Sequence, residues 1–176
     1  MDNTSLKALF TEIYDKESDA IFRFCVTRVS SREQALDLTQ DTFVRLWRSL
    51  IQGQEIRNPR AFLFTVAHRL IIDWYRKKKP MPFEELGGDG EDEEFDPTDL
   101  VDFEGLELGA EGRYLLGKIA ELHPSYRQAV YLRFVEGLSP PEIGEILGLT
   151  ANAASVRISR GIERLRKLTG YGGEKS

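Results

Sequence analysis

Apolar residues recur every three to four positions along most of the chain, the spacing that places them on one face of a helix. The pattern predicts two short helices over residues 4–15 and 17–29, then helices over 31–50 and 59–79. A second group of helices is predicted from about Gly112 to residue 167. The fold class that follows is all-α, with two small helical domains.

The clearest local signals lie between residues 138 and 167. Ser139 and Glu142 have the spacing of a capping box at the start of a helix. Gly148 is placed to end that helix with a positive φ, and Thr150 is placed to cap a second, longer helix. This second helix has an apolar stripe, and arginines crowd its remaining surface. The pattern predicts a helix-turn-helix whose basic second helix fits the DNA major groove.

An ordinary helical hairpin with solvated arginines is the alternative interpretation of this segment. The distribution of charge favours DNA binding, although the net charge of the chain is −5. Residues 80–112 hold 13 of the 29 acidic residues and no Lys or Arg, and the blocks on either side have a net charge of +4 each. Two basic blocks joined by an acidic connector are therefore predicted. The composition of the acidic connector is typical of a flexible linker. Its apolar residues leave open whether part of the connector docks on a surface.

The helix predicted over residues 59–79 combines aromatic and basic residues. Asn58 is placed to cap it, and Pro59 suits its first position. A site for single-stranded or melting DNA needs cations that hold the phosphates and aromatic rings that stack on the bases. A solvated basic helix end with core aromatics would look the same, so this helix alone leaves both interpretations open.

Several function classes receive no support from the sequence. The single cysteine, Cys25, is expected to be a buried thiol, and His68 has no second His or Cys nearby for a metal site. No phosphate loop, paired metal ligands or activated nucleophile is recognisable, so neither an enzyme nor a cofactor is expected. The lack of a long apolar run or signal peptide predicts a cytoplasmic protein that does not bind a membrane by itself.

Three segments, in this order, resemble the extracytoplasmic-function (ECF) sigma factors of the sigma-70 family. Residues 37–47 (DLTQDTFVRLW) resemble the polymerase-binding helix of that family. Residues 58–79 resemble its promoter −10 helix, and residues 122–166 resemble its −35 domain. The resemblance implies sigma region 2 over residues 1–79, an acidic linker over 80–112 and sigma region 4 over 113–170.

The resemblance also implies a function in promoter recognition, DNA opening and transcription initiation. The implied partners are core RNA polymerase, at its β′ clamp and β flap, promoter DNA and, for many family members, an anti-sigma protein. The implied polymerase-binding residues are Asp37, Gln40, Asp41 and Arg45. The implied −10 residues are Asn58, Arg60, His68, Arg69, Trp74, Arg76 and Lys77. The implied −35 residues are Ser155, Val156, Arg157, Ser159 and Arg160.

Two positions depart from the pattern of the family. Arg69 stands where an asparagine is common, and Ser155-Val156 stands where a basic residue followed by serine is common. Two other classes remain as alternatives: a transcriptional regulator that binds duplex DNA without polymerase, and an interaction adaptor that uses the connector as its binding segment. Co-purification with core polymerase separates these three hypotheses.

Overall fold

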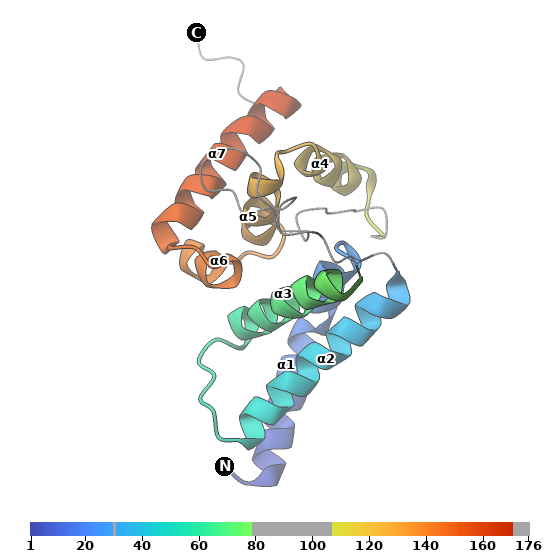
Figure 1. Ribbon diagram of the computed structural model, residues 1–176, viewed down its shortest axis with the longest axis vertical. Coiled ribbons are helices and arrows are strands. Elements are labelled where there is room, and N and C mark those ends of the chain that lie inside the picture. Colours follow the sequence, from blue (N-terminus) through green and yellow to red (C-terminus); the bar gives the residue numbers. More distant parts are fainter. Residues whose placement is uncertain (30, 79–106, 171–176) are drawn as a thin grey trace.

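The computed structural model describes residues 1–29, 31–78 and 107–170, which form seven helices and no strand (Figure 1). The helices are α1 Asn3–Val26, α2 Arg32–Ile51, α3 Pro59–Lys78, α4 Ala110–Ala120, α5 Pro124–Phe134, α6 Pro140–Leu147 and α7 Ala151–Thr169. The predicted all-α class is confirmed. Most of the acidic connector lies outside the described residues.

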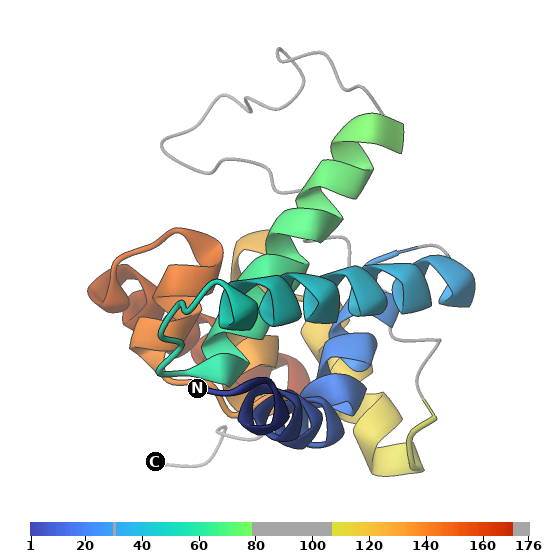
Figure 2. The ribbon, with the colours of Figure 1, turned by 90° about the horizontal axis from the view of Figure 1, so that it is seen from below.

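The first three helices form a bundle. Helices α1 and α2 pack along each other and α3 crosses them, as Figure 2 shows from a second side. Between them lie fully buried apolar side chains, which include Ile21, Phe24, Leu46, Leu63 and Phe64. Complete burial of such a side chain contributes about 1.5–3 kcal/mol, so the apolar stripes found in the sequence supply the main stabilisation of this bundle.

Helix α1 corrects the sequence-based prediction, because two short helices were expected where the chain forms one helix of 24 residues. The stretch between the two predicted helices contains no Gly or Pro to interrupt a helix. Glu17, where the second helix was predicted to begin, lies inside this single helix. It is only 4% exposed and forms an ion pair with Arg60 of α3, so it marks a contact with another helix.

The last four helices form a second bundle that ends in the predicted helix-turn-helix. Helix α6 begins at a complete capping box, in which Ser139 accepts from the Glu142 amide and the Glu142 carboxylate accepts from the Ser139 amide. Gly148 ends α6 with a φ of +69°, and the Thr150 side chain accepts from the Ala153 amide to begin α7. These boundaries confirm the prediction made from the caps.

Gly161 allows α7 to lie close against α5. A Cβ at this position would stand 2.4 Å from Cγ2 of Val130, which is a stiff β-branched side chain. We expect Gly161→Ala to lower the free energy of unfolding by about 1–3 kcal/mol, the usual cost of overpacking a core. Urea unfolding followed by circular dichroism measures this loss.

Gly117 of α4 supplies the matched control, because a Cβ there meets nothing within 4 Å. Gly117→Ala is expected to stabilise the protein by about 0.5–1 kcal/mol, as alanine does in an open helix. Val130→Ala combined with Gly161→Ala is expected to cost less than the two single changes added together. Additive losses would show that the two residues do not crowd each other.

The two bundles pack against each other, with α3 beside α6 (Figure 1). Buried side chains from both bundles form one continuous cluster, and the Phe24 ring of α1 lies 6.5 Å from the Tyr131 ring of α5. The helix-turn-helix is therefore held next to the start of α3.

Candidate functional site

The exposed side of α7 carries the predicted −35 residues. Ala154, Ile158 and Gly161 are buried against the bundle. The five predicted DNA contacts lie on the rest of the helix: Val156, Ser159 and Arg160 are exposed, and Ser155 and Arg157 are half-buried. A basic helix with one face in the core and the other in solvent has the form that enters a major groove.

The predicted −10 residues do not share one environment. Arg69, Arg76 and Lys77 are exposed along α3, whereas Trp74 is half-buried and packs edge to face on Tyr75, with ring centroids 4.9 Å apart. The Tyr75 hydroxyl donates a hydrogen bond to the carbonyl of Arg28. This contact ties the C-terminal part of α3 to the segment that follows α1.

His68 departs from its predicted place on the DNA surface. It is 4% exposed and belongs to the interior of the bundle. It lies one turn from the buried residues Phe64 and Ile71, so the helical period that exposes Arg69 turns His68 inward. His68 therefore offers no surface contact to DNA in this conformation.

The outer face of α2 carries the predicted polymerase-binding residues. Asp37, Gln40, Asp41 and Arg45 are all exposed, because the core positions of the helix point away from them. Val44 is also exposed on this helix, with 44% of its surface accessible. We refer to the four polar residues as the α2 face.

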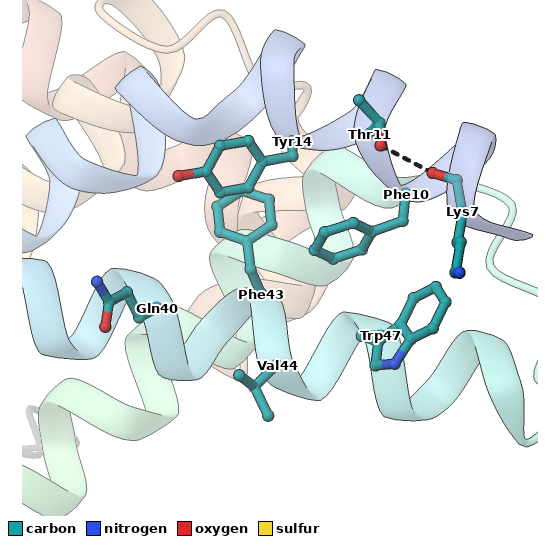
Figure 3. Close-up of a pocket in the computed structure, with 8 residues that line it drawn as sticks. All are labelled: Lys7, Phe10, Thr11, Tyr14, Gln40, Phe43, Val44 and Trp47. Carbon is teal, nitrogen blue, oxygen red and sulfur yellow. Dashed lines mark hydrogen bonds between the residues drawn. The ribbon is translucent and has the colours of Figure 1, made fainter.

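An open groove of about 600 Å³ lies between α1 and α2 beside this face (Figure 3). It is lined by Lys7, Phe10, Thr11, Tyr14, Gln40, Phe43, Val44 and Trp47. Its aromatic rings contact one another edge to face, with centroids 5.5 Å apart for Phe10–Trp47 and 4.8 Å for Tyr14–Phe43. This groove was not predicted from the sequence; Val44, an apolar residue on the polar side of α2, is one signal that points to it.

A buried ionic cluster joins the two bundles. Glu136, in the loop after α5, receives two hydrogen bonds from Arg23, at 2.8 and 3.0 Å, and one from the Tyr131 hydroxyl at 2.8 Å. Arg60 donates to Glu17, to the Glu136 carboxylate at 3.2 Å and to the Glu136 carbonyl at 2.6 Å. We call Glu17, Arg23, Arg60, Tyr131 and Glu136 the interdomain cluster.

The charges in this cluster stabilise one another. The hydrogen bond between Arg23 and Glu136 raises the pKa of Arg23, so the guanidinium stays protonated. Burial raises the pKa of Tyr131, so its hydroxyl remains a donor at neutral pH. The side chain of Glu136 is 0% exposed, and a buried carboxylate is stable only where such partners surround it.

A second polar contact joins the bundles at the cap of α3. The Asn58 carboxamide accepts from the Ala61 amide with its oxygen, which confirms the predicted cap, and its nitrogen donates to Glu142 at 2.8 Å. Burial opposes ionisation of Glu142, but hydrogen bonds from Ser139 and Asn58 and the charge of Arg60 hold its pKa below the usual value. Glu142 is therefore an anion at neutral pH.

Residues 1–29, 31–78 and 107–170 contain no group of three His, Cys, Asp or Glu side chains placed to hold a metal ion. Burial raises the pKa of the Cys25 thiol to about 12, so this confirmed core residue is unreactive. None of the described helices has the length and apolar character that crossing a membrane requires.

Comparison with known proteins gives one consistent family. Residues 13–80 match the family model for sigma-70 region 2, and residues 112–165 match the model for sigma-70 region 4. The ECF RNA polymerase sigma factor SigW of Bacillus subtilis is 32% identical, over 90% of this chain and 87% of SigW. The chain belongs to the ECF sigma factors. As a member, it directs promoter recognition, DNA opening and transcription initiation by RNA polymerase.

A second relative agrees with this ECF assignment, and two solved structures share the fold. BldN of Streptomyces coelicolor is 31% identical over 90% of this chain, which spans 60% of BldN. The sigma factor RpoE of Bartonella quintana matches the fold with a TM-score of 0.62 at 20% identity, over 93% of this chain and 98% of RpoE. CnrH matches with a TM-score of 0.57 at 23% identity, over 94% and 90% of the two chains.

The two family matches place the interdomain cluster between sigma regions. Glu17, Arg23 and Arg60 fall within the region 2 match, and Tyr131 and Glu136 fall within the region 4 match. Asn58 likewise falls within the region 2 match, and Glu142 within the region 4 match. The contacts described above therefore join the two DNA-binding regions of this sigma factor.

Proposed function

We propose that this ECF sigma factor docks on core RNA polymerase through the α2 face and reads the promoter with α3 and α7. The corresponding domains are region 2 over residues 1–79, the acidic linker over 80–112 and region 4 over 113–170. The observation that carries the proposal is that exposed members of the three predicted sets lie on three different helices, α2, α3 and α7, while the apolar side of each helix is buried.

Region 4 is proposed to bind the −35 element through the exposed side of α7. Arg160 is suited to two hydrogen bonds with a guanine, and Arg157, nearer the core, to a phosphate. The serines at 155 and 159 are short and read bases with low selectivity. Region 4 is also proposed to contact the β flap of polymerase, as the family resemblance implies.

Region 2 is proposed to bind the −10 element and hold it open. The loop over residues 52–58 is proposed to receive a flipped base, and Arg69, Arg76 and Lys77 to contact phosphates beside it. Trp74, fixed against Tyr75, is proposed to support the melted strand by stacking. Asn58 and Arg60 are proposed to contribute to the −10 site as well, and in this structure both contact the second bundle.

The α2 face and its groove are proposed to bind the β′ clamp of polymerase. Polar residues beside an apolar groove combine specificity with desolvated contact area, as protein interfaces commonly do. RpoE of Bartonella quintana was solved in complex with the anti-sigma factor NepR, and CnrH in complex with the cytosolic domain of CnrY. An anti-sigma protein is proposed here as a further partner.

This sigma factor is proposed to act without catalysing a reaction, since it supplies promoter contacts to the polymerase that makes RNA. It is proposed to work in the cytoplasm, where the polymerase is. Co-purification of the full chain with core polymerase tests the proposed function directly. A regulator that binds duplex DNA without polymerase would not be retained.

Alanine at Asp37, Gln40 and Asp41 together is expected to weaken binding to core polymerase at least tenfold, the effect of about 1.4 kcal/mol. The fold should persist, because changes at exposed sites usually alter stability by less than about 0.5 kcal/mol. Titration of labelled sigma factor with core polymerase measures the affinity. Glu12→Ala/Asp15→Ala, which also removes two exposed acids, is the control and should bind normally. Equal affinities for the two variants would show that the α2 face is not the docking surface.

A further inference from the structure

We propose that the N-terminal half of α7 selects A·T base pairs in the −35 element, with Asn152 bound to the edge of an adenine and Val156 packed against the methyl group of a thymine. The inference rests on the proposed function of α7 in −35 binding and adds the bases that this helix selects. Asn152 is not among the −35 residues that the family resemblance implies.

The register of α7 defines the side that faces DNA. Three buried residues at helical spacing mark the core side: Ala154, Ile158 and Gly161. A set shifted by two residues points about half a turn away from the core. This shifted set is Asn152, Val156 and Ser159, and all three are exposed. Val156 therefore lies near the centre of the side opposite the core.

This side of α7 is clear of the first bundle. Among the described helices, α7 contacts α4, α5 and α6, which all belong to its own bundle. Val156 keeps 38% of its surface accessible. A single exposed apolar residue is ordinary on a protein surface. The distinguishing feature of Val156 is its place, one helical turn from Asn152 on one side and from Arg160 on the other.

The carboxamide of Asn152 is not used in the cap of α7. The Thr150 hydroxyl forms that cap and accepts from the Ala153 amide at 3.0 Å. An asparagine carboxamide matches adenine in the major groove, because its oxygen accepts from the N6 amino group while its nitrogen donates to N7. The N-terminal residues of a recognition helix are the ones that contact base edges. Asn152 has both the position and the chemistry for adenine.

Val156 has the chemistry to select thymine. The major-groove edge of thymine carries a methyl group, and an apolar side chain recognises it by excluding water from the contact. A G·C pair at the same place would present the amino group of cytosine to a side chain that cannot accept its hydrogen bond. The valine that departs from the family pattern at this position thus favours thymine and disfavours cytosine.

The side chains are spaced for neighbouring base pairs. From Asn152 to Arg160, α7 rises about 12 Å, which corresponds to three or four base pairs at about 3.4 Å each. Glu163 follows on the same side and is exposed, with Lys167 at 3.9 Å. Its negative charge opposes an approach to phosphates, so the base-reading side ends before it. The expected −35 element has A·T pairs beside the guanine proposed for Arg160.

The test of Val156 removes one methyl group from the DNA. Reconstituted holoenzyme first selects its preferred −35 sequence from a library, and each thymine of that sequence is then replaced by uracil, which lacks only the methyl group. At one position this should lower the promoter affinity of the unmodified protein about threefold, the effect of one buried methyl group. In Val156→Ser the same replacement should have no effect.

The test of Asn152 uses 7-deazaadenine, which lacks the N7 acceptor and still pairs with thymine. At one position it should weaken binding by the unmodified protein several-fold, and it should cause no further loss in Asn152→Ala. Leu168→Ser is the control, because it removes another exposed apolar side chain of α7 beyond the proposed base-reading side. This control should keep both responses, and circular dichroism verifies that each variant keeps its helices.

Tolerance of uracil at every −35 thymine, or an equal uracil effect in the unmodified protein and Val156→Ser, would overturn the role of Val156. A full 7-deazaadenine effect in Asn152→Ala would overturn the role of Asn152. The proposed function of α7 is judged separately by Arg157→Ala and Arg160→Ala. If neither changes −35 binding, α7 is not the reading helix and both proposals fall. If they weaken binding while the base analogues have no effect, only the selection of A·T pairs is rejected.

Discussion

Replacing Arg69, Arg76 and Lys77 with alanine is expected to lower the affinity of the holoenzyme for promoter DNA on the order of a hundredfold. All three are exposed on α3, whose C-terminal part is fixed by Tyr75. Hydrogen bonds from exposed cations contribute about 1 kcal/mol each, and about 3 kcal/mol corresponds to that change in affinity. The measurement is promoter binding by reconstituted holoenzyme.

The salt dependence identifies these contacts as phosphate contacts. Each phosphate neutralised on a single strand contributes about 0.7 to the slope of log affinity against log salt, so losing three should flatten the slope by about 2. Lys16→Ala/Arg113→Ala/Lys118→Ala removes the same charge elsewhere and should leave the slope nearly unchanged. If the α3 variant keeps the original slope, its cations are a solvated helix end, as the sequence alone allowed.

Features that depend on neighbouring residues were predictable from the sequence. The caps at Ser139, Gly148 and Thr150 lie where the pattern placed them. The predicted stripe of α7 is buried at Ala154 and Ile158 and half-buried at Ile162 and Leu165. The exposed residues of α2 followed from its apolar period in the same way. Hydrogen bonds and packing within a few turns decide these features, so short-range sequence rules describe them.

Features that depend on the meeting of distant segments were missed. The pair between Arg23 and Glu136 joins residues 113 positions apart, and neither residue stands in a motif that points to the other. The ion pair between Glu17 and Arg60, which are 43 positions apart, was missed for the same reason. His68 was expected on the −10 surface from the family resemblance, although the helical period buries it.

Arg160 is expected to determine much of the sequence preference at the −35 element. It is exposed on α7, one position before the buried Gly161. A bidentate arginine–guanine contact discriminates against other bases by about 1–3 kcal/mol. Arg160→Ala should therefore reduce transcription from the preferred −35 sequence about tenfold to a hundredfold, with little change for the weaker sequences. Transcription by reconstituted holoenzyme from a library of −35 variants measures this loss of preference.

Arg157 provides the comparison, because it is half-buried on the same helix and is proposed to contact phosphate. Arg157→Ala should weaken binding by a similar factor for every −35 sequence and flatten the salt dependence by about one ion. On a template whose −10 region is already melted, opening should be nearly intact in both variants, because α3 is unchanged. If Arg160→Ala keeps the original order of preference among the −35 variants, Arg160 is a backbone anchor and the base-reading side of α7 must be sought at Ser155 and Ser159.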